Sequence, residues 1–185
     1  MGTIGVHEFV SLDGVFEDPQ WTAPYGFTEG MGDAIGALTA GSRAILLGRT
    51  TFQMFAPAWS TRTAEDDPGA PFFNDTTKYV VSSTLQSAGE WQNSTVFGGY
   101  DPAAIRRLKD DVDGTIFVSG SGTLVRALLA DGLVDALHLF VYPVVLGAGA
   151  RLFPEGTPQT PLALTEQEAY ENGVLHLTYG PDGRG

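Results

Sequence analysis

Apolar and polar residues alternate along the first segment of the chain, which predicts a strand over Thr3 to Val10 with Ile4, Val6 and Val10 on one face. Short apolar runs bounded by turn-forming residues predict further strands. These cover Arg43 to Leu47, Lys78 to Ser82, Thr115 to Val118 and Ala136 to Val145. Two more strands are predicted near the end of the chain, one that contains Leu162 and Leu164 and one that covers Val174 to Tyr179.

Apolar positions at helical spacing predict helices between these strands. They cover Met31 to Leu38, Thr51 to Phe55 with an end before Pro57, a segment that opens at Asp101 and Pro102, and Thr123 to Ala130 closed by Gly132. The polar, acidic stretch from Ser60 to Asp75 is predicted to be a surface loop.

Strands that alternate with helices predict an α/β fold, with a mainly parallel central sheet and helices on both of its faces. The strand-rich C-terminal part predicts additional antiparallel strands at one edge. The length of 185 residues is that of one domain, which we expect to span residues 1–185.

Charge and composition argue against several classes of protein. The formal net charge is −12, from 22 acidic and 10 basic residues, and no basic stripe is present that could hold nucleic acid. Cysteine is absent, which removes disulfides and thiolate metal sites. The first residues lack the basic segment of a signal peptide, and the longest apolar run, around Leu133 to Leu146, is too short and too polar to cross a bilayer. We therefore expect a cytoplasmic protein that has neither nucleic acid nor a membrane as partner.

A glycine-rich loop between a strand and a helix is the strongest local feature. The predicted strand Thr115 to Val118 runs into Ser119-Gly120-Ser121-Gly122, and the helix that follows opens with Thr123 and Leu124. Free backbone N–H groups and the positive end of a helix dipole meet there, so phosphate or pyrophosphate is a natural ligand. A tight turn that merely needs glycine is the alternative.

Two other strand ends carry similar chemistry. Gly48-Arg49-Thr50-Thr51 joins a strand to a helix, and the guanidinium of Arg49 suits a phosphate monoester. Ser82 and Ser83 follow the next strand. Each could be an ordinary surface or capping feature when taken alone. In an open α/β sheet, however, ligands bind beyond the carboxyl ends of the strands, where all three would lie together.

Five segments, in order, resemble the dihydrofolate reductase superfamily, and most closely the bacterial branch related to the C-terminal reductase domain of riboflavin-biosynthesis proteins. These segments are Ser11 to Gly14, Leu47 to Phe52, Val80 to Ser83, Val118 to Leu124, and Gly132 to Phe153. The resemblance implies a three-layer α/β/α fold and an oxidoreductase that uses NADPH. It places Arg49, Ser82 and Ser83 at the cofactor's 2′-phosphate and Gly120, Ser121, Gly122 and Thr123 at its pyrophosphate.

The chain departs from the family pattern at several positions. Gly120-Ser121 stands where the family has Gly-Gly, and Ala136 stands where a glutamate is expected. Thr76 occupies the position of the arginine that clamps folate, and His7-Glu8-Phe9 lacks the lysine of riboflavin-pathway reductases. These departures favour a different small-molecule substrate, with a heterocyclic or carbonyl group.

A hydride transfer to such a group needs a source of protons. Asp13, in the turn after the first strand, is the preferred candidate, and the alternative is a turn aspartate that bonds to its own backbone. Glu29 and Asp33 are further candidates, although both are expected to be solvated. Aromatic residues could form a wall for a flat substrate or simply pack in the core: Trp21, Tyr25, Phe27, Phe52 and Trp59. The histidines, His7, His138 and His176, lack the sequence spacing of a metal site, and we expect no metal.

Three functional hypotheses therefore remain. The first is an NADPH-dependent reductase, and the second is a protein that binds NADPH or a small molecule without significant catalysis. In the third, no dinucleotide binds, and Arg49 should then be held in an internal ion pair. Relatives in this branch suggest a homodimer, to which the segments Leu137 to Val145 and Val174 to Tyr179 would contribute.

Overall fold

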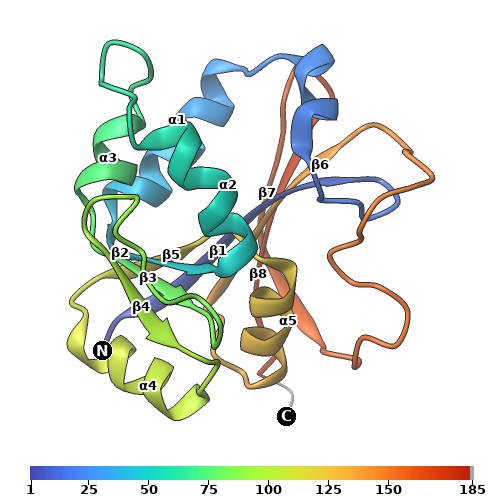
Figure 1. Cartoon of the computed structure of the whole chain (residues 1–185). Helices are drawn as coiled ribbons and strands as arrows, with labels where there is room; N and C mark the ends of the chain where they lie inside the picture. Colours follow the sequence, from blue (N-terminus) through green and yellow to red (C-terminus); the bar gives the residue numbers. More distant parts are fainter. Residues whose placement is uncertain (184–185) are drawn as a thin grey trace.

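A single eight-stranded sheet forms the centre of the computed structural model, which describes residues 1–183 (Figure 1). Its strands are β1 (Thr3–Ser11), β2 (Ser42–Gly48), β3 (Lys78–Val81), β4 (Ser94–Gly98), β5 (Thr115–Val118), β6 (Ala136–Tyr142), β7 (Leu162–Ala169) and β8 (Leu175–Pro181). The order across the sheet is β4-β3-β2-β5-β1-β6-β8-β7. The strands from β4 to β6 are parallel, whereas β8 is antiparallel to both β6 and β7. The predicted mostly parallel sheet with antiparallel C-terminal strands is confirmed.

Helices cover both faces of this sheet because the inner strands are apolar on both sides. The helices are the 3-10 helix η1 (Pro19–Tyr25) and the α-helices α1 (Glu29–Ala40), α2 (Arg49–Trp59), α3 (Ala70–Asp75), α4 (Pro102–Asp111) and α5 (Gly122–Ala130). Ile105 of α4 and Leu128 of α5 pack on the face that carries Ile4 and Val6. Helices α1, α2 and α3 contribute to the two apolar clusters of the other face. The three-layer prediction is confirmed.

Four details differ from the sequence-based predictions. Helix α2 continues past Pro57 to Trp59, because the proline lies in the exposed last turn, where the missing N–H leaves a carbonyl that water can reach. The predicted loop Ser60 to Asp75 ends in α3, whose Phe72 and Phe73 pack against the sheet. The strand predicted as Ala136 to Val145 stops at Tyr142, since Pro143 cannot continue the ladder. The edge strand β4 was not predicted.

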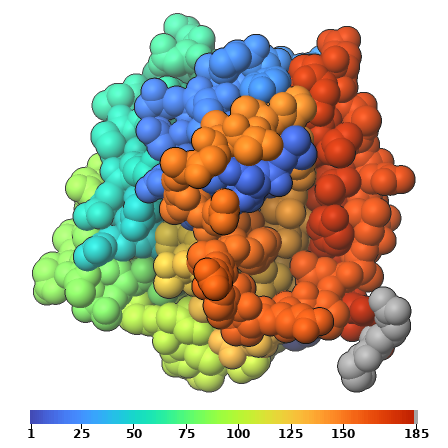
Figure 2. All heavy atoms as spheres, turned by 90° about the vertical axis from the view of Figure 1, so that its right-hand side faces the viewer, coloured from blue at the N-terminus to red at the C-terminus, as the bar shows by residue number. Residues whose placement is uncertain are grey.

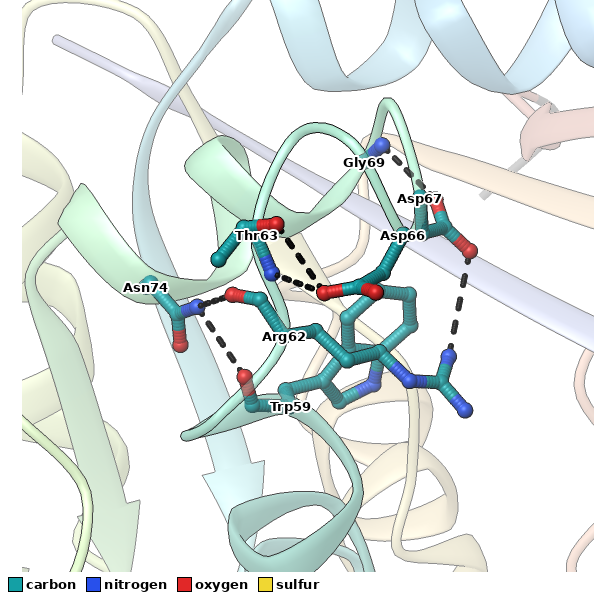
Figure 3. A network of polar contacts seen from close by, with 7 residues as sticks. All are labelled: Trp59, Arg62, Thr63, Asp66, Asp67, Gly69 and Asn74. Carbon is teal, nitrogen blue, oxygen red and sulfur yellow. Dashed lines mark hydrogen bonds and ion pairs between the residues drawn. The ribbon is translucent and has the colours of Figure 1, made fainter.

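Asn74 of α3 holds the end of α2 and the residues that follow it (Figure 3), and it also holds the connection between β3 and β4. Its side-chain amide nitrogen donates to the carbonyls of Trp59 and Arg62, both at 3.0 Å. Its amide oxygen accepts from the indole N–H of Trp91 at 2.7 Å. In the segment between α2 and α3, the Asp66 carboxylate accepts hydrogen bonds from the backbone N–H and the hydroxyl group of Thr63. The segment from 59 to 74 is therefore ordered by polar contacts as well as by its aromatic residues.

The segment after β1 lies beside the long connection after β6. Leu12 N–H donates to the Val144 carbonyl at 2.8 Å, and Phe16 N–H donates to the Ala150 carbonyl at 3.1 Å. Figure 2 shows this pairing, with the orange connection crossing the surface next to the blue segment. Within residues 1–183, no helix is long and apolar enough to cross a membrane.

Candidate functional site

Two strand-to-helix loops meet at the carboxyl edge of the parallel strands. Strands β2 and β5 are neighbours, so the loops that follow them leave the sheet side by side. The N–H of Gly48 donates to the Gly120 carbonyl at 3.2 Å. A Cβ atom on Gly48 would lie 2.2 Å from Ser121 Oγ, closer than real atoms approach. Gly48 is therefore required by the contact between the two loops.

Neither of the helices that start at these loops has a side-chain cap. Helix α2 follows Gly48 and helix α5 follows Ser121, and in the described part of the chain no capping side chain accepts a hydrogen bond from the first N–H groups of either helix. Each helix N-terminus carries a partial positive charge from its free N–H groups. The edge therefore presents two neighbouring groups of donors that suit an anion.

The glycine loop itself is closely packed on both sides. Gly120 has φ of +80° and precedes a cis peptide bond to Ser121. A Cβ atom on Gly120 would lie 2.5 Å from Thr51 Oγ1, and one on Gly122 would lie 2.5 Å from Phe16 Cζ. The left-handed backbone and the close neighbours explain the glycine at position 120.

Arg49 lies on the same edge, beside the hydroxyl groups that follow β3. Its side chain is exposed, and Nη1 donates to Thr84 Oγ1 at 2.8 Å. Ser82 Oγ accepts from the N–H groups of Thr84 and Leu85, and Ser83 is exposed. Among residues 1–183, Arg49 forms no ion pair. The internal ion pair that was expected if no dinucleotide binds is therefore not found in the described chain.

The other residues predicted for this site differ in their surroundings. Thr50 is exposed in the first turn of α2, whereas Thr51 touches Gly120. Thr123 Oγ1 accepts from Arg126 at 3.3 Å. Leu124 is 4% exposed, so its side chain anchors α5 on the sheet.

Asp13 does not have the surroundings of a proton donor. Its carboxylate accepts hydrogen bonds from Ser11 Oγ at 2.7 Å, from Leu146 N–H at 3.1 Å and from Gly147 N–H at 2.8 Å. The bond from Ser11, followed by those from Leu146 and Gly147, lowers its pKa to about 2. The group is ionised at neutral pH, and its contacts connect the turn after β1 to the connection after β6.

Glu8 is a polar residue of this region that the sequence analysis did not place. It lies on the core face of β1, 7% exposed, and accepts a hydrogen bond from the backbone of Gly120. Its Oε1 has no hydrogen-bond partner among residues 1–183. Burial raises the pKa of Glu8 to about 8, so the group is largely protonated at neutral pH. The signal in the sequence was an acidic residue in line with the apolar Ile4, Val6 and Val10.

Lys78 is not available to a ligand. It is fully buried, and Nζ donates to the carbonyls of Phe73, Asn74 and Thr76 at 2.7, 3.2 and 2.8 Å. Burial lowers its pKa to about 8. The lysine therefore holds the end of α3, and it cannot replace the arginine that is missing at Thr76.

The candidate aromatic residues do not form one wall. Trp21 and Tyr25 both pack edge-on against Tyr142, with ring centroids 5.5 and 5.6 Å apart. Phe52 is buried in the core, and Trp59 stacks on Phe73 at 4.3 Å. Phe27 is exposed. Most of these rings serve packing.

Sequence comparison places the chain among known proteins. The family model of the RibD C-terminal domain matches residues 3–176. The uncharacterized protein YyaP of Bacillus subtilis (strain 168) is 29% identical over 103 residues, or 55% of this chain and 53% of YyaP. The uncharacterized protein YwjB of the same organism is 27% identical over 136 residues, or 71% of each chain. The match thus spans about half the length of YyaP.

Structural comparison gives the same fold. A putative riboflavin biosynthesis protein from Shewanella sp. PV-4 superposes with a TM-score of 0.79 at 19% identity, covering 97% of this chain and 99% of that one. A dihydrofolate reductase from Enterococcus faecalis, solved in complex with NADP(H) and RAB-propyl, gives 0.60 at 15% identity, covering 96% and 95%. The chain belongs to the RibD C-terminal domain family and has a dihydrofolate-reductase-like fold.

Proposed function

We propose that the protein is an NADPH-dependent reductase of a small substrate with a heterocyclic or carbonyl group. The observation that carries the proposal is the meeting of two uncapped helix N-termini with the exposed Arg49 at one edge of the sheet. Such an edge favours a ligand with both a pyrophosphate and a phosphate monoester. The Enterococcus faecalis enzyme, which shares the fold, was solved with NADP(H), and this supports the choice of cofactor.

The residues of the edge divide between the two phosphate groups. The backbone of Gly120, Ser121, Gly122 and Thr123 would hold the pyrophosphate at the start of α5. Arg49, with the hydroxyls of Ser82 and Ser83, would hold the 2′-phosphate. The bound cofactor would supply the hydride.

Glu8 suits this arrangement because burial raises its pKa and so favours the neutral carboxyl group. An ionised carboxylate directly under the loop would repel a pyrophosphate, whereas a neutral carboxyl group does not. The contact from Gly120 to Glu8 then fixes the loop at no cost in charge. The −12 net charge of the chain makes such local neutrality important.

Folate and ribose phosphates are not the substrates that this site favours. Thr76 stands where an arginine that binds folate was expected. Lys78 Nζ donates to three backbone carbonyls, so it has no donor left for a ligand. A small substrate that lacks a carboxylate tail or a phosphate fits these residues better.

A second candidate function, binding without significant catalysis, is favoured by Asp13. Its carboxylate is ionised and accepts hydrogen bonds from Ser11 Oγ and from two backbone N–H groups, so it brings no proton to a substrate. The remaining candidates, Glu29 and Asp33, are exposed on α1. A reductase would therefore not draw its proton from any of these three carboxyl groups.

The decisive experiment is a titration with NADPH and NADH, read by ligand fluorescence. We expect the wild type to bind NADPH more tightly than NADH. Loss of a charge-assisted hydrogen bond costs about 1.5–3 kcal/mol, so Arg49→Gln should weaken NADPH binding roughly 10- to 100-fold and leave NADH nearly unchanged. Arg107→Gln, on the exposed side of α4, is the matched control. If neither cofactor binds, the proposal fails.

Turnover separates the two candidate functions. The wild type with NADPH and a panel of carbonyl and heterocyclic compounds should oxidise the cofactor, as followed by its absorbance. Tight binding without oxidation across the panel would favour the binding protein.

A homodimer remains a proposal, supported by the exposed Leu164 and Leu175 on the antiparallel strands β7 and β8. Analytical ultracentrifugation should show a dimer, and a monomer at micromolar concentration would contradict it.

A further inference from the structure

The register of the sheet brings together histidines that are far apart in the sequence. His7 of β1 pairs with His138 of β6. His138 Nδ1 lies 3.1 Å from His176 Nε2 of β8, and His176 pairs with Glu168 of β7. A row of ionisable groups therefore crosses four neighbouring strands on the face covered by α1.

A groove of about 590 Å³ opens at the outer part of this row. Its walls include Ala34, Ala37 and Leu38 of α1 on one side and His138, His176, Glu166 and Glu168 on the other. It also touches Thr115, the first residue of β5, whereas the glycine loop follows the other end of that strand. The groove is thus separate from the proposed dinucleotide site.

The charged groups of this groove are acidic. Among residues 1–183, no lysine or arginine lines it. Asp135, which also lines it, is engaged by Lys109 Nζ at 2.6 Å and by the N–H of Ile4 at 2.6 Å. Glu166 and Glu168 form no ion pair within residues 1–183. The net charge of the groups that line the groove is therefore negative.

The imidazole of His138 adds a polar group to the groove without adding positive charge. Burial, followed by the charge of His176, lowers the pKa of His138 to about 4, so His138 is neutral at neutral pH. Its Nε2 has no hydrogen-bond partner in the described chain, whereas Nδ1 contacts His176 and Thr178. A ligand that donates hydrogen bonds and carries positive charge is complementary to this set.

We propose that the groove binds a small organic cation with an apolar body, of the class of aryl or alkyl amines. The ammonium group would lie among Glu166, Glu168 and His138, and the apolar body would pack against Ala37 and Leu38. A metal ion fits less well, because residues 1–183 contain no group of three or more side chains placed to hold one.

Three probes of similar shape test the charge requirement: benzylammonium, benzyl alcohol and benzoate. Imidazole NMR signals of His138 and His176 should shift saturably with benzylammonium. Benzyl alcohol should bind about tenfold more weakly, and benzoate should not bind, since two exposed ion pairs contribute about 1 kcal/mol or slightly more together. Equal binding of the ammonium and the alcohol would overturn the proposal.

Variants locate the binding in the groove. Glu166→Gln with Glu168→Gln should reduce benzylammonium affinity to that of benzyl alcohol and leave NADPH affinity unchanged. Glu171→Gln, an exposed acid that does not line the groove, is the control and should change neither. An unchanged affinity in the double variant, or Zn²⁺ shifting both imidazoles at lower concentration than the amine, would contradict the proposal.

Discussion

Replacing Gly48 with alanine tests the contact between the two loops. The added Cβ would lie 2.2 Å from Ser121 Oγ and 2.9 Å from both Ser121 Cβ and its backbone nitrogen. Non-bonded heavy atoms prefer about 3.5 Å or more, so the two helix N-termini must move apart by roughly 1 Å. Overpacking of this kind costs about 1–3 kcal/mol. For a chain of this length, that free energy lowers Tm by roughly 2–12 °C.

Thermal unfolding and NADPH titration would measure both consequences. Gly48→Ala should lower Tm and weaken NADPH binding. Adding Ser121→Gly should restore part of the stability, since it removes Oγ and Cβ but leaves the backbone nitrogen. Gly36→Ala, in α1 with no atom within 4 Å of the new Cβ, is the control and should raise stability by about 0.5–1 kcal/mol. A Gly48→Ala variant with wild-type Tm and wild-type affinity would refute this account of the loops.

Two further predictions concern buried ionisable groups. Lys78→Met removes the donor shared by three carbonyls and should lower the free energy of unfolding by about 1–3 kcal/mol; an unchanged urea midpoint would count against the role of Lys78. The pKa of Glu8 rises from 4.5 in the unfolded chain to about 8 in the folded protein, so the stability that this group contributes is full below pH 4.5 and is lost as the pH rises through 8. At about 1.4 kcal/mol per pKa unit, the loss is on the order of 5 kcal/mol, and urea unfolding of Glu8→Gln should lack it; the same pH slope in the variant and the wild type would contradict this prediction.

Local patterns were sufficient to predict most of the elements and the place where the loops meet. The alternation in β1 and the apolar runs of β2 and β5 predicted strands, and the helices between the strands predicted that these are parallel. Parallel strands bring their carboxyl ends to one edge. Gly48, Arg49 and the glycine loop could therefore be grouped before any geometry was known. Their close approach, with Gly120 against Thr51, needed the structure.

Features that depend on contacts between distant segments were not predictable. The row formed by His7, His138 and His176 arises from the register of the strands. This register cannot be predicted from the spacing of the histidines in the sequence. Asp13 was placed correctly in its turn, but the hydrogen bonds that it accepts from Leu146 and Gly147, in the connection after β6, could not be read from the sequence.

Phosphorus NMR of bound NADPH tests the central claim most directly, because the pyrophosphate and the 2′-phosphate give separate signals. The account predicts that both signals shift when the wild type binds. In Arg49→Gln, at saturating cofactor, the 2′-phosphate signal should return to its free position while the pyrophosphate signal stays shifted. If Arg49→Gln leaves the 2′-phosphate signal as in the wild type, or if the pyrophosphate signal never shifts, the assignment of these loops to the two phosphate groups is wrong.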